Sequence, residues 1–301
     1  MTNTTKWVLA SIGTVFVLFI VFWAAVLYFI FQGDTDEEYT SGSGGTLAVV
    51  ELKEQILTSE NIVRQFKKYR ENSSVKGIVF RVDSPGGGVS ASQEIYDEVR
   101  KTRESGKPVV VSMGSVAASG GYYVSCGANK IVANPGTITG SIGVISQFMN
   151  FNHLLDKVGV GTTTVKSGKF KDTGNPYRGM TEEEKKYFQE TIDDVYQQFL
   201  RVVEIERRLS HSVAKRLADG RIFTGKKAYE AGLVDTLGTY EDAIALAAHL
   251  SKISGTPKII KERKRERLSD ILFGGIKEEI SGIRHEILSQ PLVQYKLMQP
   301  Q

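Results

Sequence analysis

The stretch VKGIVFRVDSPGGG, residues 75–88, carries the clearest structural signal in the chain. Its first eight residues, 75–82, are mostly apolar and rich in β-branched side chains, which is typical of a buried strand. The strand ends at a Ser-Pro pair and three consecutive glycines, which permit positive φ and a close approach of the backbone to a ligand. Ile95 and Val99, four residues apart, then predict a helix over residues 90–103.

The sequence on both sides continues this alternation of strand and helix. Apolar runs predict further strands at residues 46–52, 108–113 and 130–133, and helical spacing predicts helices at 61–69, 181–209 and 241–250. The helix at 181 opens with Thr-x-x-Glu, the pattern of a capping box. Strands separated by helices imply right-handed βαβ crossovers, so we expect an α/β fold with a mainly parallel sheet flanked by helices.

Composition excludes several classes of protein. The 301 residues are 24% charged and 41% hydrophobic, which indicates a globular chain. The single Cys126 excludes an intramolecular disulfide, and four histidines without an HExxH pattern predict no metal site. The net charge of +4 equals that of residues 258–267 alone, so the rest is formally neutral and nucleic acid is not an expected partner.

The N-terminus predicts a membrane anchor. Residues 7–31 carry no charge and are long enough to cross a bilayer, with Lys6 before them and acidic residues after them. A cleaved signal peptide is the alternative, but the apolar run is long and no Ala-x-Ala site follows it. We therefore expect a single-pass protein of the cell membrane, with a cytoplasmic N-terminus and an extracytoplasmic domain.

These features divide the chain into four parts, which are a tail and anchor at 1–31, a linker at 32–45, a domain at 46–256 and a tail at 257–301. The last part begins with KIIKERKRER, which predicts either a further helix or a solvated basic segment near lipid headgroups. The amphipathic residues that follow could pack on a neighbour, on a membrane, or in the active-site groove of the chain itself.

A second glycine-rich segment, residues 115–144, contains Ser119 directly before two glycines and a short predicted helix at 122–126. Ser119 is either a nucleophile beside exposed backbone amides or simply the cap of that helix. Neither glycine-rich segment matches a P-loop or dinucleotide pattern, and Gly-x-Ser-x-Gly is absent because Ala117 replaces the first glycine. No cofactor is expected.

A serine nucleophile needs a base, and the residues alone leave several candidates. His153 and His211 lie in ordinary contexts, whereas KSGKFKD, residues 166–172, offers three lysines in an exposed loop or edge strand. On an extended chain Lys169 and Lys171 would face the same side. A lysine acts as a base only where its surroundings lower its pKa, which the sequence does not reveal.

Five motifs resemble, in order, the A-type signal peptide peptidases of bacteria and archaea: DSPGGG, SVAASGGYYV, GTITGSIGV, SGKFKD and GRIFTGKKAYEAGLVD. The resemblance covers about residues 46–250. It implies a Ser/Lys serine endopeptidase with a Clp-protease and crotonase-like fold, which degrades remnant signal peptides and other short apolar peptides at the membrane.

The resemblance also assigns roles to residues. It makes Ser119 the nucleophile, Lys171 the general base and Ser141 the group that orients the lysine. The backbone amides of Gly87, or its neighbour Gly86, and of Gly120 would form the oxyanion hole.

The chain has one copy of each motif and therefore looks like the short form of the family, whose members assemble into rings or domes with dyads shared between protomers. Two other functions remain as alternatives, a crotonase-like enzyme acting on acyl-CoA and a non-catalytic membrane scaffold of the same fold.

Overall fold

The computed structural model describes residues 3–31, 36–263 and 294–296. The chain forms two compact units, Met1–Glu38 with Glu262–Ser289, and Tyr39–Lys261 with Gln290–Gln301. The described part of the first unit contains helix α1 (Asn3–Phe31), and the sequence of strand β1 (Asp36–Tyr39) includes the boundary between Glu38 and Tyr39. All further elements described below belong to the second unit, except the end of strand β10.

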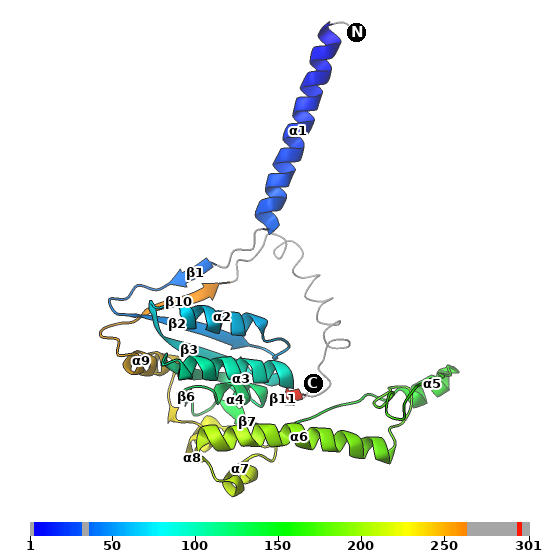
Figure 1. Ribbon diagram of the computed structural model, residues 1–301, viewed down its shortest axis with the longest axis vertical. Coiled ribbons are helices and arrows are strands. Elements are labelled where there is room, and N and C mark those ends of the chain that lie inside the picture. The colour runs from blue at the N-terminus through cyan, green and yellow to red at the C-terminus, as the bar shows by residue number, and fades with distance from the viewer. Residues whose placement is uncertain (1–2, 32–35, 264–293, 297–301) are drawn as a thin grey trace. The chain divides into compact units, whose positions relative to one another are not determined.

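A mainly parallel sheet forms the centre of the second unit, as the sequence predicts (Figure 1). Its strands follow the order β10-β2-β3-β5-β6-β9, and every neighbouring pair along this path is parallel. Strand β7 pairs with the end of β5, and β8 pairs antiparallel with β7. The strands are β2 (Thr46–Lys53), β3 (Val75–Ser84), β5 (Val109–Ala118), β6 (Lys130–Ala133), β7 (Ile138–Gly140), β8 (Ile222–Thr224), β9 (Thr236–Leu237) and β10 (Lys258–Arg263).

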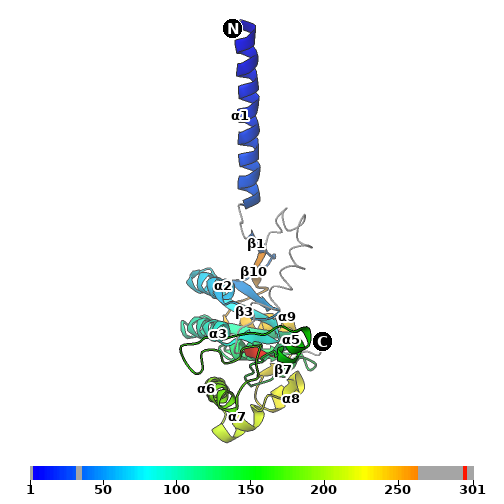
Figure 2. The ribbon, with the colours of Figure 1, turned by 90° about the vertical axis from the view of Figure 1, so that its right-hand side faces the viewer.

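Helices cover both faces of this sheet (Figure 2). Leu47 and Val49 of β2 belong to the apolar cluster that includes helix α9, whereas Ala48 and Val50 belong to the larger cluster on the opposite face. Successive side chains of a strand point to opposite faces, and both faces are covered here, so residues 47–50 are all apolar and buried. The helices are α2 (Glu60–Glu71), α3 (Val89–Glu104), α4 (Gly120–Ser125), α5 (Asn152–Val158), α6 (Glu182–Arg207), α7 (His211–Leu217), α8 (Gly225–Glu230) and α9 (Tyr240–Leu250).

Helix α6 begins where the capping box predicts. The Thr181 hydroxyl accepts a hydrogen bond from the Glu184 amide, and the Glu184 carboxylate accepts one from the Thr181 amide. The segment between β7 and α6 contains α5, which lies far from the sheet, near the N-terminal end of α6 (Figure 1). None of the α5 residues is buried.

The prediction of a membrane anchor is wrong by the structural criterion. Among the described residues, no helix is both long and apolar enough to span a membrane. This finding overturns the predicted single-pass localisation, including the cytoplasmic N-terminus and the extracytoplasmic domain.

The start of the predicted C-terminal tail also differs from expectation. Residues 258–261 form neither a helix nor a solvated segment, because they pair in parallel with β2 from Thr46 to Val49. Ile260 is buried against the core, which explains how a segment with several lysines and arginines joins a sheet. Residues 264–293, which include the rest of the basic run, lie outside the described residues.

Candidate active site

Ser119 lies between the last residue of β5 and the first residue of α4 and has an unusual backbone, φ 52° and ψ −115°. Positive φ is uncommon for a residue with a side chain, and such backbone strain clusters at functional sites. The side chain occupies the position of a helix cap but makes no capping hydrogen bond. Ser119 is 1% exposed, and its Oγ is buried and has no hydrogen-bond partner among the described residues.

The sheet brings Ser141 next to Ser119. Ala118 of β5 pairs with Gly140 of β7, and the Ser119 amide donates to the Gly140 carbonyl at 2.7 Å. The two serines therefore follow paired residues at the carboxyl ends of neighbouring parallel strands. Ser141 also has positive φ, 50°, and its amide donates to the Arg221 carbonyl at 2.8 Å.

The three glycines of the DSPGGG motif form a short strand of their own, β4 (Gly86–Gly88), beside Ile56. The Ile56 amide donates to the Gly86 carbonyl and the Gly88 amide to the Ile56 carbonyl, both at 2.8 Å. Because backbone groups alternate in an extended strand, the amide of Gly87 points to the side away from Ile56. The Gly86 amide already donates to the Ser84 hydroxyl at 3.2 Å, so Gly87 is the better candidate for an oxyanion donor.

Gly120 approaches this strand closely. A β-carbon on Gly120 would lie 3.1 Å from the Gly87 nitrogen, and a β-carbon on Gly86 would lie 2.6 Å from the Gly120 nitrogen. Only glycine allows these two backbones to come so near each other. As the first residue of α4, Gly120 has an amide without an acceptor inside the helix, so the Gly87 and Gly120 amides are adjacent donors.

The Asp83 carboxylate fixes the end of the preceding strand. It accepts a hydrogen bond from the Val116 amide at 3.0 Å, and a β-carbon on Gly114 would lie only 2.5 Å from its carboxyl carbon. The pairing of β3 with β5 shifts register at this point, between Val82 and Ser84. The side chain of Asp83 thus sets the offset that places the glycines beside Ser119.

An extended segment from the far end of the chain lies against the glycine strand. Strand β11 (Gln294–Lys296) pairs antiparallel with β4, with Tyr295 opposite Gly87. On its other side, Gln294 exchanges two backbone hydrogen bonds of 3.1 Å with Ile145. A β-carbon on Gly86 would lie 2.0 Å from the Tyr295 carbonyl oxygen and 2.6 Å from the Gly120 nitrogen. The Tyr295 oxygen therefore lies close to the Gly120 amide.

The Tyr295 side chain fills an aromatic pocket and is fully buried. Its ring stacks on Tyr123 at a centroid distance of 5.1 Å and lies 4.7 Å from the ring of Phe199. The hydroxyl donates to the Val195 carbonyl at 3.2 Å, and burial raises the pKa of Tyr295 far above its ordinary value. The pocket therefore suits a large, neutral side chain.

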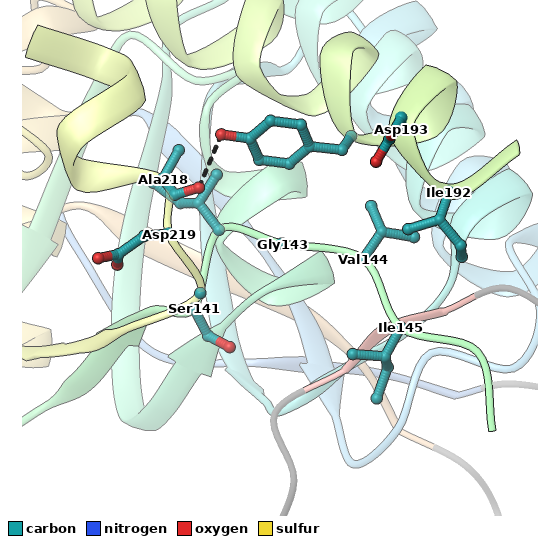
Figure 3. Close-up of a pocket in the computed structure, with 11 residues that line it drawn as sticks. Ser141, Gly143, Val144, Ile145, Ile192, Asp193, Ala218 and Asp219 are labelled. Atoms are coloured by element: carbon teal, nitrogen blue, oxygen red, sulfur yellow. Dashed lines mark hydrogen bonds between the residues drawn. The ribbon is translucent and has the colours of Figure 1, made fainter. Parts of the chain in front are cut away.

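Ser141 lines a cavity of about 560 Å³ (Figure 3). Residues of three segments line it, namely 141–145, the α6 residues Ile192, Asp193 and Tyr196, and 218–220. Tyr196 closes one side by donating to the Ala218 carbonyl at 2.8 Å. Ile145 lines this cavity and also pairs with Gln294 of β11, so one residue borders both the cavity and the extended segment.

Lys171 is not brought to Ser119 within this chain. It lies in a turn, with its amide donating to the Gly168 carbonyl at 3.1 Å, and its side chain is exposed. Among the described residues, no hydrogen bond joins it to either serine. Because the segment is a turn and not an extended strand, the expectation that Lys169 and Lys171 share one side does not apply.

Sequence reasoning missed several residues of the groove. Ile56 and Ile145 contribute only backbone groups, so their side chains gave no signal. Tyr123 could have been noticed because it follows Ser119 by one helical turn. Tyr295 lies in a stretch that the sequence left undecided.

Comparisons with known proteins agree with this geometry. The model of peptidase family S49 matches residues 101–254, just over half of the chain, and the Clp protease model matches residues 48–137. A putative signal peptide peptidase SppA of Enterococcus faecium is 44% identical over 185 residues, covering 62% of this chain and 54% of that protein. A putative protease of Methanocaldococcus jannaschii is 42% identical over 204 residues, covering 68% and 64%.

Among solved structures, a ClpP1 mutant from Listeria monocytogenes aligns with a TM-score of 0.45 and 17% identity, over 65% of this chain and 93% of that one. The chain spans between about half and two thirds of the length of the two curated relatives described above. Since the family model matches just over half of the sequence, including both serines and Lys171, the chain belongs to peptidase family S49.

Proposed function

We propose that the protein is a serine endopeptidase that binds short peptides as an extended strand and cleaves them with Ser119. One observation carries this proposal. A segment of the chain itself, β11, already lies as an antiparallel strand against the glycines, with a carbonyl oxygen close to the Gly120 amide. Binding a peptide by strand addition is a general mode of recognition that uses backbone groups for affinity and pockets for specificity.

In the proposed reaction, neutral Lys171 takes the proton of the Ser119 hydroxyl while the serine oxygen attacks the peptide carbonyl. The negative charge that develops on the carbonyl oxygen is stabilised by the amides of Gly87 and Gly120. The C–N bond then breaks, and the amine leaves with the proton from the lysine. Water hydrolyses the acyl-enzyme by the same path, and Ser141 orients the lysine.

We propose that a second copy of the chain supplies Lys171. In support, the lysine is exposed and lies on a segment whose apolar side chains are exposed as well. Leu154, Val158 and Val165 are 58%, 63% and 96% exposed. An assembly of copies would bury these side chains and place the lysine of one protomer beside the serine of the next, in a ring or dome.

The pocket that holds Tyr295 suggests the substrate class. Peptides with a large aromatic or apolar residue at the corresponding position would bury that side chain against Tyr123 and Phe199, which is worth about 1.5–3 kcal/mol. Remnants of signal peptides are apolar and short, and a relative carries the name putative signal peptide peptidase. We propose such peptides as substrates.

Hydrolysis of a fluorogenic peptide containing tyrosine tests the proposal. Wild type should cleave it, Ser119→Ala should lose at least about 10³-fold in rate, and Ser125→Ala should stay within a few-fold of wild type. Ser125 is a suitable control because its hydroxyl lies in the same helix and donates to the Gly121 carbonyl at 2.7 Å. Equal rates for wild type and Ser119→Ala would refute the proposal.

The base is tested in parallel. Lys171→Ala should abolish cleavage, whereas Lys169→Ala should retain it because Lys169 pairs with the exposed Glu183. Mixing Ser119→Ala with Lys171→Ala chains should restore part of the activity, since some sites then combine an intact serine with an intact lysine. A mixture that assembles but stays inactive would contradict the shared site. Binding of a CoA thioester without peptide cleavage would instead favour a crotonase-like enzyme.

A further inference from the structure

The turn that carries Lys171 is held by one arginine. The Arg178 guanidinium donates through Nε to the Asp172 carboxylate at 2.8 Å and through Nη1 to the Glu184 carboxylate at 2.9 Å. Its Nη2 donates to the other Glu184 oxygen at 2.5 Å and to the Asp172 carbonyl at 3.2 Å. Arg178 therefore binds both the side chain and the backbone of the residue that follows Lys171.

Glu184 connects this arginine to helix α6. It forms the capping box with Thr181, so its position is fixed by the first turn of the helix. Its side chain is 5% exposed and that of Asp172 is 10% exposed, which leaves little room for either carboxylate to move. Thr173 adds a hydrogen bond of 3.3 Å to Glu184. The turn is thus attached to the rigid end of a long helix.

Other charged groups around the turn pair with one another. Lys166 pairs with Asp172 and donates to the Lys169 carbonyl at 3.0 Å, while Lys169 pairs with Glu183 at 2.5 Å. The bond to Arg178 is the main cause that lowers the pKa of Asp172, and it also lowers the pKa of Glu184 to about 2. Both carboxylates are consequently ionised at any pH at which a lysine could be neutral.

We propose that Arg178 is a positioning residue for Lys171, which holds the turn on α6 and neutralises the carboxylate of Asp172 next to the lysine. This inference rests on the proposed role of Lys171 as the base. A guanidinium is suited to the task because it presents a planar fork to two carboxylates at once, whereas an ammonium would act as a single point charge.

The proposal has a measurable consequence. Without Arg178 the turn is less well fixed, and misplacement of a catalytic group by about 1 Å costs on the order of 100-fold in rate. In addition, the Asp172 carboxylate loses one of its two cationic partners and keeps only Lys166. The loss should appear in kcat, because the turn carries the proposed base.

The test compares Arg178→Gln and Arg178→Lys with wild type, using kcat and KM of peptide cleavage. We expect Arg178→Gln to lower kcat by about 10- to 100-fold with little change in KM. Arg178→Lys keeps a positive charge but not the fork, so it should recover only part of kcat. Arg100→Gln is the matched control, because Arg100 also bridges two carboxylates, those of Asp97 and Glu104.

The outcomes separate the two levels of the argument. If Lys171→Ala cleaves peptide as well as wild type, the proposed base is wrong and the role of Arg178 fails with it. If Lys171→Ala is inactive but Arg178→Gln matches Arg100→Gln in kcat and KM, only the positioning role is refuted. Should Arg178→Gln not fold, Asp172→Asn takes its place because it weakens the same contact, and an unchanged kcat in that variant would overturn the positioning role.

Discussion

Gly86→Ala tests the geometry of the groove most directly. At this residue φ is +100°, and a β-carbon would lie 2.0 Å from the Tyr295 carbonyl oxygen and 2.6 Å from the Gly120 nitrogen. The new methyl group would therefore occupy the place that the proposal gives to the substrate carbonyl. Because the variant would no longer stabilise the oxyanion, its kcat/KM should fall by at least about 10²–10³-fold.

The same change also strains the backbone, so stability must be measured separately. An alanine in the left-handed region costs about 1–2 kcal/mol. Gly106→Ala supplies the matched control, because Gly106 has φ +86° but a β-carbon there would meet nothing within 4 Å. Both variants should lose a similar amount of unfolding free energy from strain, with a further loss for Gly86→Ala from its contacts.

Urea unfolding and cleavage of the tyrosine-containing peptide together decide the matter. We expect Gly106→Ala to be less stable than wild type but fully active when folded. Gly86→Ala should be inactive under the conditions in which urea unfolding shows that it is folded. If folded Gly86→Ala cleaved peptide within about threefold of Gly106→Ala, a threshold far below the loss expected for one oxyanion donor, the position assigned to the substrate carbonyl would be wrong.

Three other predictions follow from the same contacts. Ser119→Ala should leave the melting temperature unchanged or slightly higher in calorimetry, because it removes a buried hydroxyl that has no partner; a clear fall would show that the hydroxyl is structural. Tyr295→Ala should raise the rate of cleavage of an added peptide by about 10-fold or more, since β11 loses its buried anchor and competes less well for the groove; an unchanged rate would mean that β11 does not compete. The low pKa of Glu184, about 2 against an ordinary 4.5, means that its contribution to stability is complete above about pH 4.5 and is lost as the pH falls toward 2. Arg178→Gln should weaken this acid dependence in urea unfolding, and an identical dependence would contradict the pairing.

Much of the sheet could be predicted from local patterns. The run at 75–82 is apolar and β-branched, and it becomes a buried strand because both faces of the sheet are covered. Strand β10 was missed because its lysines and arginines dominate the composition, although Ile260 is the residue that enters the core. A charged segment still completes a sheet when it offers one apolar residue to each face, here Ile260 to one cluster and Ile259 to the other.

The site was predictable only in part, for a physical reason. Ser119 and Ser141 meet because parallel strands end at the same edge, and the order of strands follows from the alternation with helices. The contact between Tyr295 and the glycine strand joins residues more than two hundred positions apart, and no local pattern encodes it. Lys171 lies in a turn that Arg178 holds through Asp172. Composition does not reveal such a contact.

The pairing of β10 with β2 also has a consequence for how the chain folds. Thr46 is among the first residues of the sheet to be synthesised, whereas its partner Lys258 follows only after nearly the whole domain. Until then, the outer edge of β2 stays unpaired, and its sequence TLAVVEL is apolar enough to recruit another chain. One of the most distant pairings in the sheet is thus the one that closes its most aggregation-prone edge, so a chain released before residue 258 is synthesised would leave that edge exposed.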